Sequence, residues 1–264
     1  MYEFHYHKVS SINEVKEKIS SLDDPKIMAG GMTLIPTMKQ RLAAPSDIID
    51  LSDINELRGI SKEKDFIIIG SMTTHFEVHT SEIVKKEIPS LAFLAGLIGD
   101  PMVRHRGTIG GSVANSDPSA DYPSSVISLG AKIITDKREI DADDFFIDLF
   151  ETALDDDEII ISLKFPIPNK AAYMKFPQPA SRYALVGVFV AVTKEGIRVG
   201  VTGAGPCAFR SKEIEKALSQ DFSENSIENV NIPSENLNSD IHASAEYRSH
   251  LVKVMAKRAI KKLS

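Results

Sequence analysis

Short apolar runs alternate along the chain with segments whose apolar residues recur every three or four positions. The runs predict a buried strand over residues 65–71 and a strand over 131–136. They also predict a short strand that runs into a glycine pair within 25–31, and a strand followed by a turn within 47–54. The helical spacing predicts helices over residues 11–20, 34–43 and 118–130, and two helices within 73–99 that Pro89 separates. Strands and helices that alternate in this way are typical of mixed α and β folds.

The pattern changes in the window 157–181, where four prolines predict irregular structure. The apolar runs 183–192 and 197–205 follow, joined by Thr-Lys-Glu-Gly, which predicts a β-hairpin. We therefore place a domain boundary near residue 166. The predicted domains are 1–165, with subdomains at about 1–55 and 56–165, and 166–264.

Two helices are expected in the second predicted domain. The shorter one covers residues 211–218 and the longer one 245–263. The predicted buried face of the longer helix comprises Leu251, Val254, Met255, Arg258 and Ala259. The lysines of this helix are expected on its opposite face.

Composition narrows the class of protein. The chain has 264 residues, is 42% hydrophobic and 26% charged, and carries a formal charge of −6, values typical of a folded globular protein. A negative net charge argues against nucleic acid as the main partner. No run approaches the roughly 18 apolar residues that span a bilayer, and the first residues do not have the pattern of a signal peptide. We therefore expect a cytoplasmic protein.

The cysteine count excludes two kinds of cysteine-based site within this chain. Cys207 is the single cysteine, so neither a disulfide framework nor an iron–sulfur cluster with four thiolate ligands can form within this chain. Any such cluster must belong to a partner.

Two paired-glycine segments are the main candidates for chemistry, "MAGGMTLIP" at 28–36 and "RGTIGGSVANSDPSADYP" at 106–123. Neither has the glycine spacing of a Rossmann fingerprint or a P-loop. We interpret each as a loop that follows a strand and exposes unpaired backbone amides to an anion. Two facing loops suit the pyrophosphate of a dinucleotide such as FAD, with Thr33, Thr108 and Ser112 as hydroxyl donors. The alternative is two ordinary tight turns.

Two acidic residues follow the second loop. Asp117 precedes Pro118, a pairing typical of a helix N-cap. Asp121 lies one turn later, where a ribityl hydroxyl is a suitable hydrogen-bond donor to it; the alternative is a solvated surface carboxylate. His75 and His79 have the spacing of a two-histidine metal site, but no third ligand is evident, and we favour a helix start with a solvated histidine.

Four segments in order resemble the FAD-binding medium subunits of molybdenum hydroxylases, the family of carbon monoxide dehydrogenases, aldehyde oxidoreductases and bacterial xanthine dehydrogenases. They are "AGGMTLIPTMKQRLAAPSDIIDLSDINELRGI", "RHRGTIGGSVANSDPSADYPSSVISLGAKI", "ASRYALVGVFVAV" and "GVTGAGPCAFR". The resemblance covers nearly the whole chain. It implies an α+β fold: a vanillyl-alcohol-oxidase (PCMH)-type FAD-binding domain of two α/β subdomains, then a small α/β C-terminal domain.

The resemblance also implies a site for noncovalent FAD, with no catalytic residue and no metal ligand. The pyrophosphate would be held by Ala29, Gly30, Gly31, Met32, Thr33, Leu34, Thr108, Ile109, Gly110, Gly111 and Ser112. Asn115 and Asp121 would lie by the ribityl chain, Ile160 would pack on the flavin ring and Tyr183 would shield its other side. Relatives often carry a basic residue at the position of Gln178. We expect valine at Gly110 or Gly111 to abolish FAD retention and spare the fold.

The implied function is electron transfer. Molybdopterin would lie in a large partner subunit and two [2Fe–2S] clusters in a small one, in a heterotrimer or its dimer. Electrons would pass through the clusters to FAD here and on to an external acceptor, with an aldehyde favoured over carbon monoxide or a purine as substrate. The alternatives are a self-sufficient flavin-dependent oxidoreductase on the same fold, which needs its own general base, and a noncatalytic phosphate-binding module.

Overall fold

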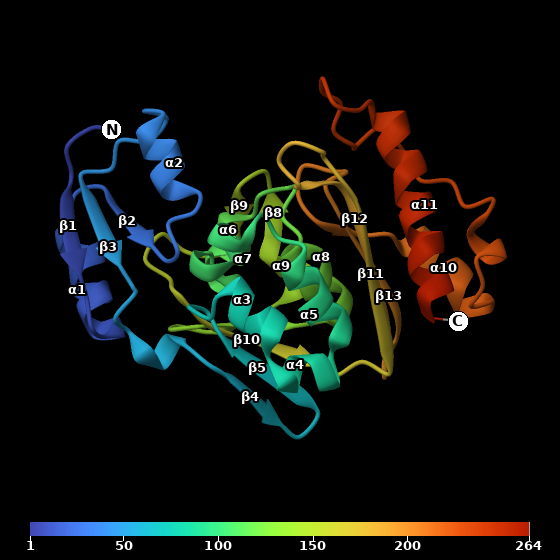
Figure 1. The fold of residues 1–264 in the computed structure, drawn as a ribbon, viewed down its shortest axis with the longest axis horizontal. Helices are drawn as coiled ribbons and strands as arrows, with labels where there is room; N and C mark the ends of the chain where they lie inside the picture. Colours follow the sequence, from blue (N-terminus) through green and yellow to red (C-terminus); the bar gives the residue numbers. More distant parts are fainter. Residues whose placement is uncertain (264) are drawn as a thin grey trace.

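The computed structural model describes residues 1–263, which form three larger sheets in a row with helices packed between and around them (Figure 1). The first sheet is parallel, in the order β1-β3-β2. Its strands and helices are β1 (His5–Lys8), α1 (Ile12–Ser21), β2 (Pro25–Met28), α2 (Leu34–Lys39) and β3 (Asp47–Asp50). A short 3-10 turn, η1 (Asn55–Leu57), leads into the next unit. The first glycine loop therefore follows β2 and opens α2.

The second sheet has the order β4-β5-β10-β6-β7, with every neighbouring pair antiparallel. Its strands are β4 (Ile60–Glu63), β5 (Phe66–Gly70), β6 (Lys132–Thr135), β7 (Glu139–Asp141) and β10 (Ile160–Pro166). The helices of this unit are α3 (His75–Thr80), α4 (Glu82–Glu87), α5 (Pro89–Gly96), α6 (Pro101–Arg106), α7 (Ile109–Asn115), α8 (Tyr122–Leu129) and α9 (Ala142–Phe145). A small hairpin of β8 (Phe146–Asp148) and β9 (Glu151–Thr152) follows α9.

The third sheet is antiparallel, in the order β11-β12-β13-β14. Its elements are β11 (Lys170–Pro177), β12 (Ala184–Thr193), β13 (Gly196–Thr202), β14 (Phe209–Arg210), α10 (Lys212–Gln220), η2 (Asn225–Ile227) and α11 (Ala245–Leu263). The predicted hairpin between β12 and β13 is confirmed. Helix α11 packs on β11 and β12, and α8 packs on β12 and β13.

Helix α8 joins the second and third units. All of its residues from Tyr122 to Leu129 are buried, and one apolar core runs from the second sheet to Tyr173 and Phe189 of the third. Because the two units share this core, the segment that leads into α8 is held from both sides. No helix in residues 1–263 is long and apolar enough to cross a membrane.

Several expectations for individual elements are wrong. The segment 73–99 forms three helices instead of two, because Ser81 ends α3 and caps α4 by accepting a hydrogen bond from the Val84 amide at 3.3 Å. The proline-rich window contains strands β10 and β11. Pro166 and Pro177 are the last residues of these strands, where proline is tolerated.

Two predicted residue positions also need correction. Asp117 is not a helix N-cap: its carboxylate accepts a hydrogen bond from the Ser119 amide at 2.8 Å within a turn, and α8 begins only at Tyr122. Arg258 is exposed, and Arg248 lies on the buried face of α11 instead. The guanidinium of Arg248 is accommodated there because it has hydrogen-bond partners.

Candidate functional site

A cavity of about 810 Å³ lies between the first glycine loop and the helices of the second unit. Its volume is within the roughly 300–1,000 Å³ of small-molecule and cofactor sites. All the site residues implied by the resemblance line it, with one exception. The exception is Ile109, whose side chain is buried in the core and whose amide donates to the Thr73 carbonyl at 3.0 Å.

The two glycine loops pack directly against each other. A Cβ atom at Gly30 would overlap the Arg106 carbonyl and lie 2.8 Å from the Gly107 Cα. A Cβ atom at Gly111 would lie 3.3 Å from the Ala29 Cβ. Glycine at these positions therefore allows the close approach of the two loops. The predicted facing arrangement of the loops is confirmed.

The first loop exposes unpaired backbone donors. Among the described residues, the amides of Gly30, Gly31, Met32 and Thr33 donate no hydrogen bond within the chain. All four residues line the cavity, and Gly31 has a positive φ of 72°. Consecutive unpaired amides at a concave surface form an anion site that needs no basic side chain. This loop fits a pyrophosphate.

The second loop differs from the prediction in two ways. It follows helix α6 instead of a strand, and its amides from Ile109 to Ser112 are already used within the chain. They donate from Ile109 to the Thr73 carbonyl (3.0 Å), from Gly110 to the Ser71 carbonyl (2.9 Å), from Gly111 to Thr108 Oγ1 (3.1 Å) and from Ser112 to the Thr108 carbonyl (3.0 Å). The amides from Ile109 to Ser112 are therefore not free to bind a ligand, and this part of the second loop supplies the shape of the cavity wall.

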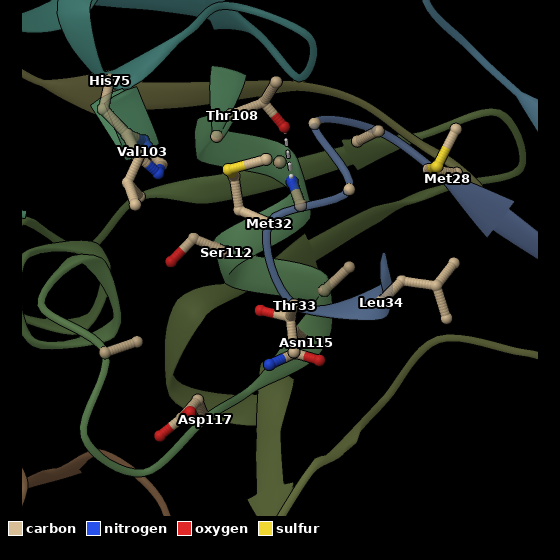
Figure 2. Close-up of a pocket in the computed structure, with 18 of the residues that line it drawn as sticks. Met28, Met32, Thr33, Leu34, His75, Val103, Thr108, Ser112, Asn115 and Asp117 are labelled. Atoms are coloured by element: carbon tan, nitrogen blue, oxygen red, sulfur yellow. Dashed lines mark hydrogen bonds between the residues drawn. The ribbon is translucent and has the colours of Figure 1, made fainter. Parts of the chain in front are cut away.

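Three polar side chains add hydrogen-bonding capacity. Thr33, Ser112 and Asn115 line the same cavity (Figure 2). Within residues 1–263, the side chains of these residues make no hydrogen bond to another residue. Hydroxyl and amide groups of this kind can bind phosphate oxygens and ribityl hydroxyls.

Asp121 is buried, with 4% of its surface exposed, so the alternative of a solvated carboxylate is wrong. It borders the cavity and accepts hydrogen bonds from the Tyr173 hydroxyl and from Lys175 Nζ, at 3.1 Å to Oδ2. Burial raises the pKa of this carboxyl, and the Lys175 ammonium opposes that rise. Asp117 also lines the cavity, and burial raises its pKa too.

His75 is a buried cavity residue and not the solvated histidine that the sequence suggested. It is 4% exposed, and its ring centroid lies 5.4 Å from that of Tyr122. Among the described residues its Nδ1 has no hydrogen-bond partner. Burial, together with the nearby charge of Arg104, lowers the pKa of His75 from 6.5 to about 4. The imidazole is therefore neutral at pH 7.

This pKa shift predicts a pH-dependent stability. As the pH falls below 6.5, the unfolded chain binds a proton at His75 before the folded chain does, so the stabilising contribution is lost as the pH falls toward 4. Between pH 7 and pH 5 the free energy of unfolding should fall by about 2 kcal/mol from this residue alone. Urea unfolding of His75→Leu should show a correspondingly flatter pH dependence. His250→Gln, an exposed histidine, is the control, and equal slopes in all three proteins would contradict the assignment.

The turn before β12 contributes cavity residues that the sequence did not reveal. Ala180, Ser181 and Arg182 line the cavity beside Tyr183, which is 45% exposed. The Gln178 side chain does not line it; its Oε1 accepts hydrogen bonds from the Ala180 amide at 2.6 Å and the Ser181 amide at 2.8 Å. Gln178 therefore shapes the turn that carries Tyr183. No sequence signal marks this role.

Further cavity residues come from other elements. They include Met28, Ser71, Met72, His75, Ile98, Gly99, Val103, Asp155, Glu158 and Ile159. Residues 1–263 contain no group of three or more histidine, cysteine or acidic side chains arranged to hold a metal ion.

Comparison with known proteins identifies the family. Residues 2–168 match the family described as the FAD binding domain in molybdopterin dehydrogenase. The chain belongs to this FAD-binding family. Residues 171–263 match the CO dehydrogenase flavoprotein C-terminal domain. The resemblance and the α+β fold inferred from the sequence are thus confirmed, and the residues of the cavity can be interpreted as those of an FAD-binding domain.

Relatives match over nearly their full length. The carbon monoxide dehydrogenase medium chain of Hydrogenophaga pseudoflava is 33% identical and is aligned over 97% of this chain and 96% of its own. The glyceraldehyde dehydrogenase medium chain of Sulfolobus acidocaldarius is 30% identical over 99% of both chains. A solved structure of the Hydrogenophaga pseudoflava carbon monoxide dehydrogenase superposes with a TM-score of 0.90 at 33% identity, covering 98% of this chain and 96% of the other.

Proposed function

We propose that this chain is the FAD-carrying electron-transfer subunit of a molybdenum hydroxylase. The observation that carries the proposal is the row of unpaired amides from Gly30 to Thr33, in a loop that packs against the second glycine loop and lines a cavity of cofactor size. Family membership supports FAD as the ligand. Bound FAD supplies the redox chemistry, by taking up and releasing electrons.

The residues of this chain bind and orient the cofactor. The amides of the first loop bind the pyrophosphate, and the hydroxyls of Thr33 and Ser112 donate further hydrogen bonds to it. Asn115 and Asp121 bind the ribityl chain. Ile160 and Tyr183 flank the flavin ring and keep water from its faces. None of these roles requires an acid or base for substrate turnover, in keeping with an electron-transfer subunit.

The partners we propose are a large molybdopterin subunit and a small subunit with two [2Fe–2S] clusters, in a heterotrimer or its dimer. Cys207 alone cannot hold a cluster, and the two relatives are named as medium chains. The aldehyde substrate is supported by the glyceraldehyde dehydrogenase relative, whereas the other relative acts on carbon monoxide. The acceptor is an external oxidant, and a cytoplasmic location stays a prediction.

The test is made on the assembled complex, before and after removal of its flavin. With the flavin removed, an aldehyde substrate should still bleach the iron–sulfur absorption of the partner, while reduction of an external acceptor dye should stop. Added FAD should restore dye reduction. Aldehyde oxidation by this chain with FAD alone would contradict the proposal and favour the self-sufficient oxidoreductase.

A further inference from the structure

A buried charge cluster lies behind the cavity wall, where β11 of the third unit meets the segment before α8. Lys175 is on β11, and its side chain is 5% exposed. Its Nζ lies 3.0 Å from Asp121 Oδ1, 3.1 Å from Asp121 Oδ2 and 3.0 Å from the Leu97 carbonyl. Of the three N–H donors of an ammonium group, one donates to Asp121 Oδ2 and one to the Leu97 carbonyl.

Each partner of Lys175 connects to the cavity. Asp121 lines it directly. Leu97 directly follows α5, and the next two residues, Ile98 and Gly99, line another part of the wall. Lys175 itself does not line the cavity. Its ammonium therefore joins two wall segments that are separated in the sequence by more than twenty residues, and it acts on the cavity only through its neighbours.

The hydrogen bonds leave Asp121 able to bind a ligand. A carboxylate offers about four lone-pair sites. The Tyr173 hydroxyl uses one on Oδ1, and Lys175 contacts both oxygens. About one site remains, and Asp121 borders the cavity. With Tyr173 and Lys175 fixed on the rigid strand β11, the carboxylate is held in one orientation before the cofactor binds.

We propose that Lys175 is a positioning residue for FAD, one that fixes the Asp121 carboxylate as a hydrogen-bond acceptor for the ribityl chain. This inference rests on the proposed function, since it concerns how the same cavity holds FAD. The alternative is that the ion pair stabilises only the junction between β11 and α8. A hydrogen bond from a ribityl hydroxyl to the Asp121 carboxylate is charge-assisted and therefore strong. Loss of its alignment should measurably lower the affinity for FAD.

The test is a titration of the flavin-free full chain with FAD, followed by quenching of flavin fluorescence. Lys175→Met should weaken FAD binding by about 10- to 100-fold. Two control variants should bind FAD as the wild type does. Lys170→Met removes an exposed lysine from the same strand, and Arg248→Met destabilises the third unit at a residue that does not line the cavity. Lys170→Met shows the effect of losing a lysine from β11, and Arg248→Met shows the effect of losing stability. A loss of FAD affinity seen only in Lys175→Met is then due to loss of positioning.

A second comparison, of Asp121→Asn with the double variant Asp121→Asn/Lys175→Met, keeps the test valid if Lys175→Met alone fails to fold with an unpaired buried carboxylate. Asp121→Asn should weaken FAD binding, and adding Lys175→Met to it should weaken binding little further, because Lys175 acts through Asp121. A further loss of about 10- to 100-fold in the double variant, or wild-type affinity in Lys175→Met, would overturn the inference while the proposed function stands. A wild-type chain that binds no FAD would instead contradict the proposed function.

Discussion

Gly111→Val should deprive the chain of its flavin and leave its fold intact. A Cβ atom at this position would lie 3.0 Å from Thr108 Oγ1 and 3.3 Å from the Ala29 Cβ. The valine methyl groups must then enter the cavity or displace the first loop, whose amides are the unpaired donors. We expect FAD affinity to fall by at least about 100-fold. The measurement is the ratio of flavin to protein after purification, together with the urea midpoint.

Two other glycines make this prediction specific. Gly59 has a positive φ and open space around its Cβ position, so Gly59→Ala introduces backbone strain without touching the cavity and should keep its flavin. Gly110 differs, because a Cβ there would overlap Ser71. The expectation that Gly110→Val spares the fold is therefore wrong, and that variant should be destabilised. Normal flavin content in a folded Gly111→Val would refute the role of the second loop.

Arg248→Met should lower the free energy of unfolding by about 4 kcal/mol. Arg248 is 3% exposed and donates to the Leu185 carbonyl at 2.8 Å, the Gly203 carbonyl at 2.7 Å and Asp240 at 2.7 Å. Methionine fills part of the volume but removes the donors to two carbonyls and to Asp240 Oδ2. The loss should appear as a lower urea midpoint.

Arg258→Met is the matched control, on the same helix but exposed to solvent. Its midpoint should stay close to that of the wild type, since exposed substitutions usually change stability by less than about 0.5 kcal/mol. Equal midpoints for the two variants would show that the buried hydrogen bonds of Arg248 contribute little to stability.

Local sequence signals predicted the features of the fold that depend on residues close together in the sequence. The paired glycines marked both loops, and the Thr-Lys-Glu-Gly turn marked the β12–β13 hairpin. The resemblance added the FAD site, and nearly every residue it implied lines one cavity. These features are encoded within a few residues of the chain.

The features that were missed depend on contacts between distant segments. Helical spacing on α11 does not distinguish an arginine with buried hydrogen-bond acceptors from an exposed one, so Arg258 was chosen over Arg248. The burial of His75 depends on Tyr122, and the orientation of Asp121 depends on Lys175. The amides of the second loop donate to Ser71 and to Thr73, which no local pattern indicates.

The central claim is that this chain holds FAD without a covalent bond. The most direct measurement is the visible absorption spectrum of the purified full chain before and after acid precipitation. We predict a flavin spectrum that moves into the supernatant, where mass analysis identifies FAD. A folded chain that is colourless and does not take up added FAD would contradict the claim and would make the two glycine loops ordinary turns.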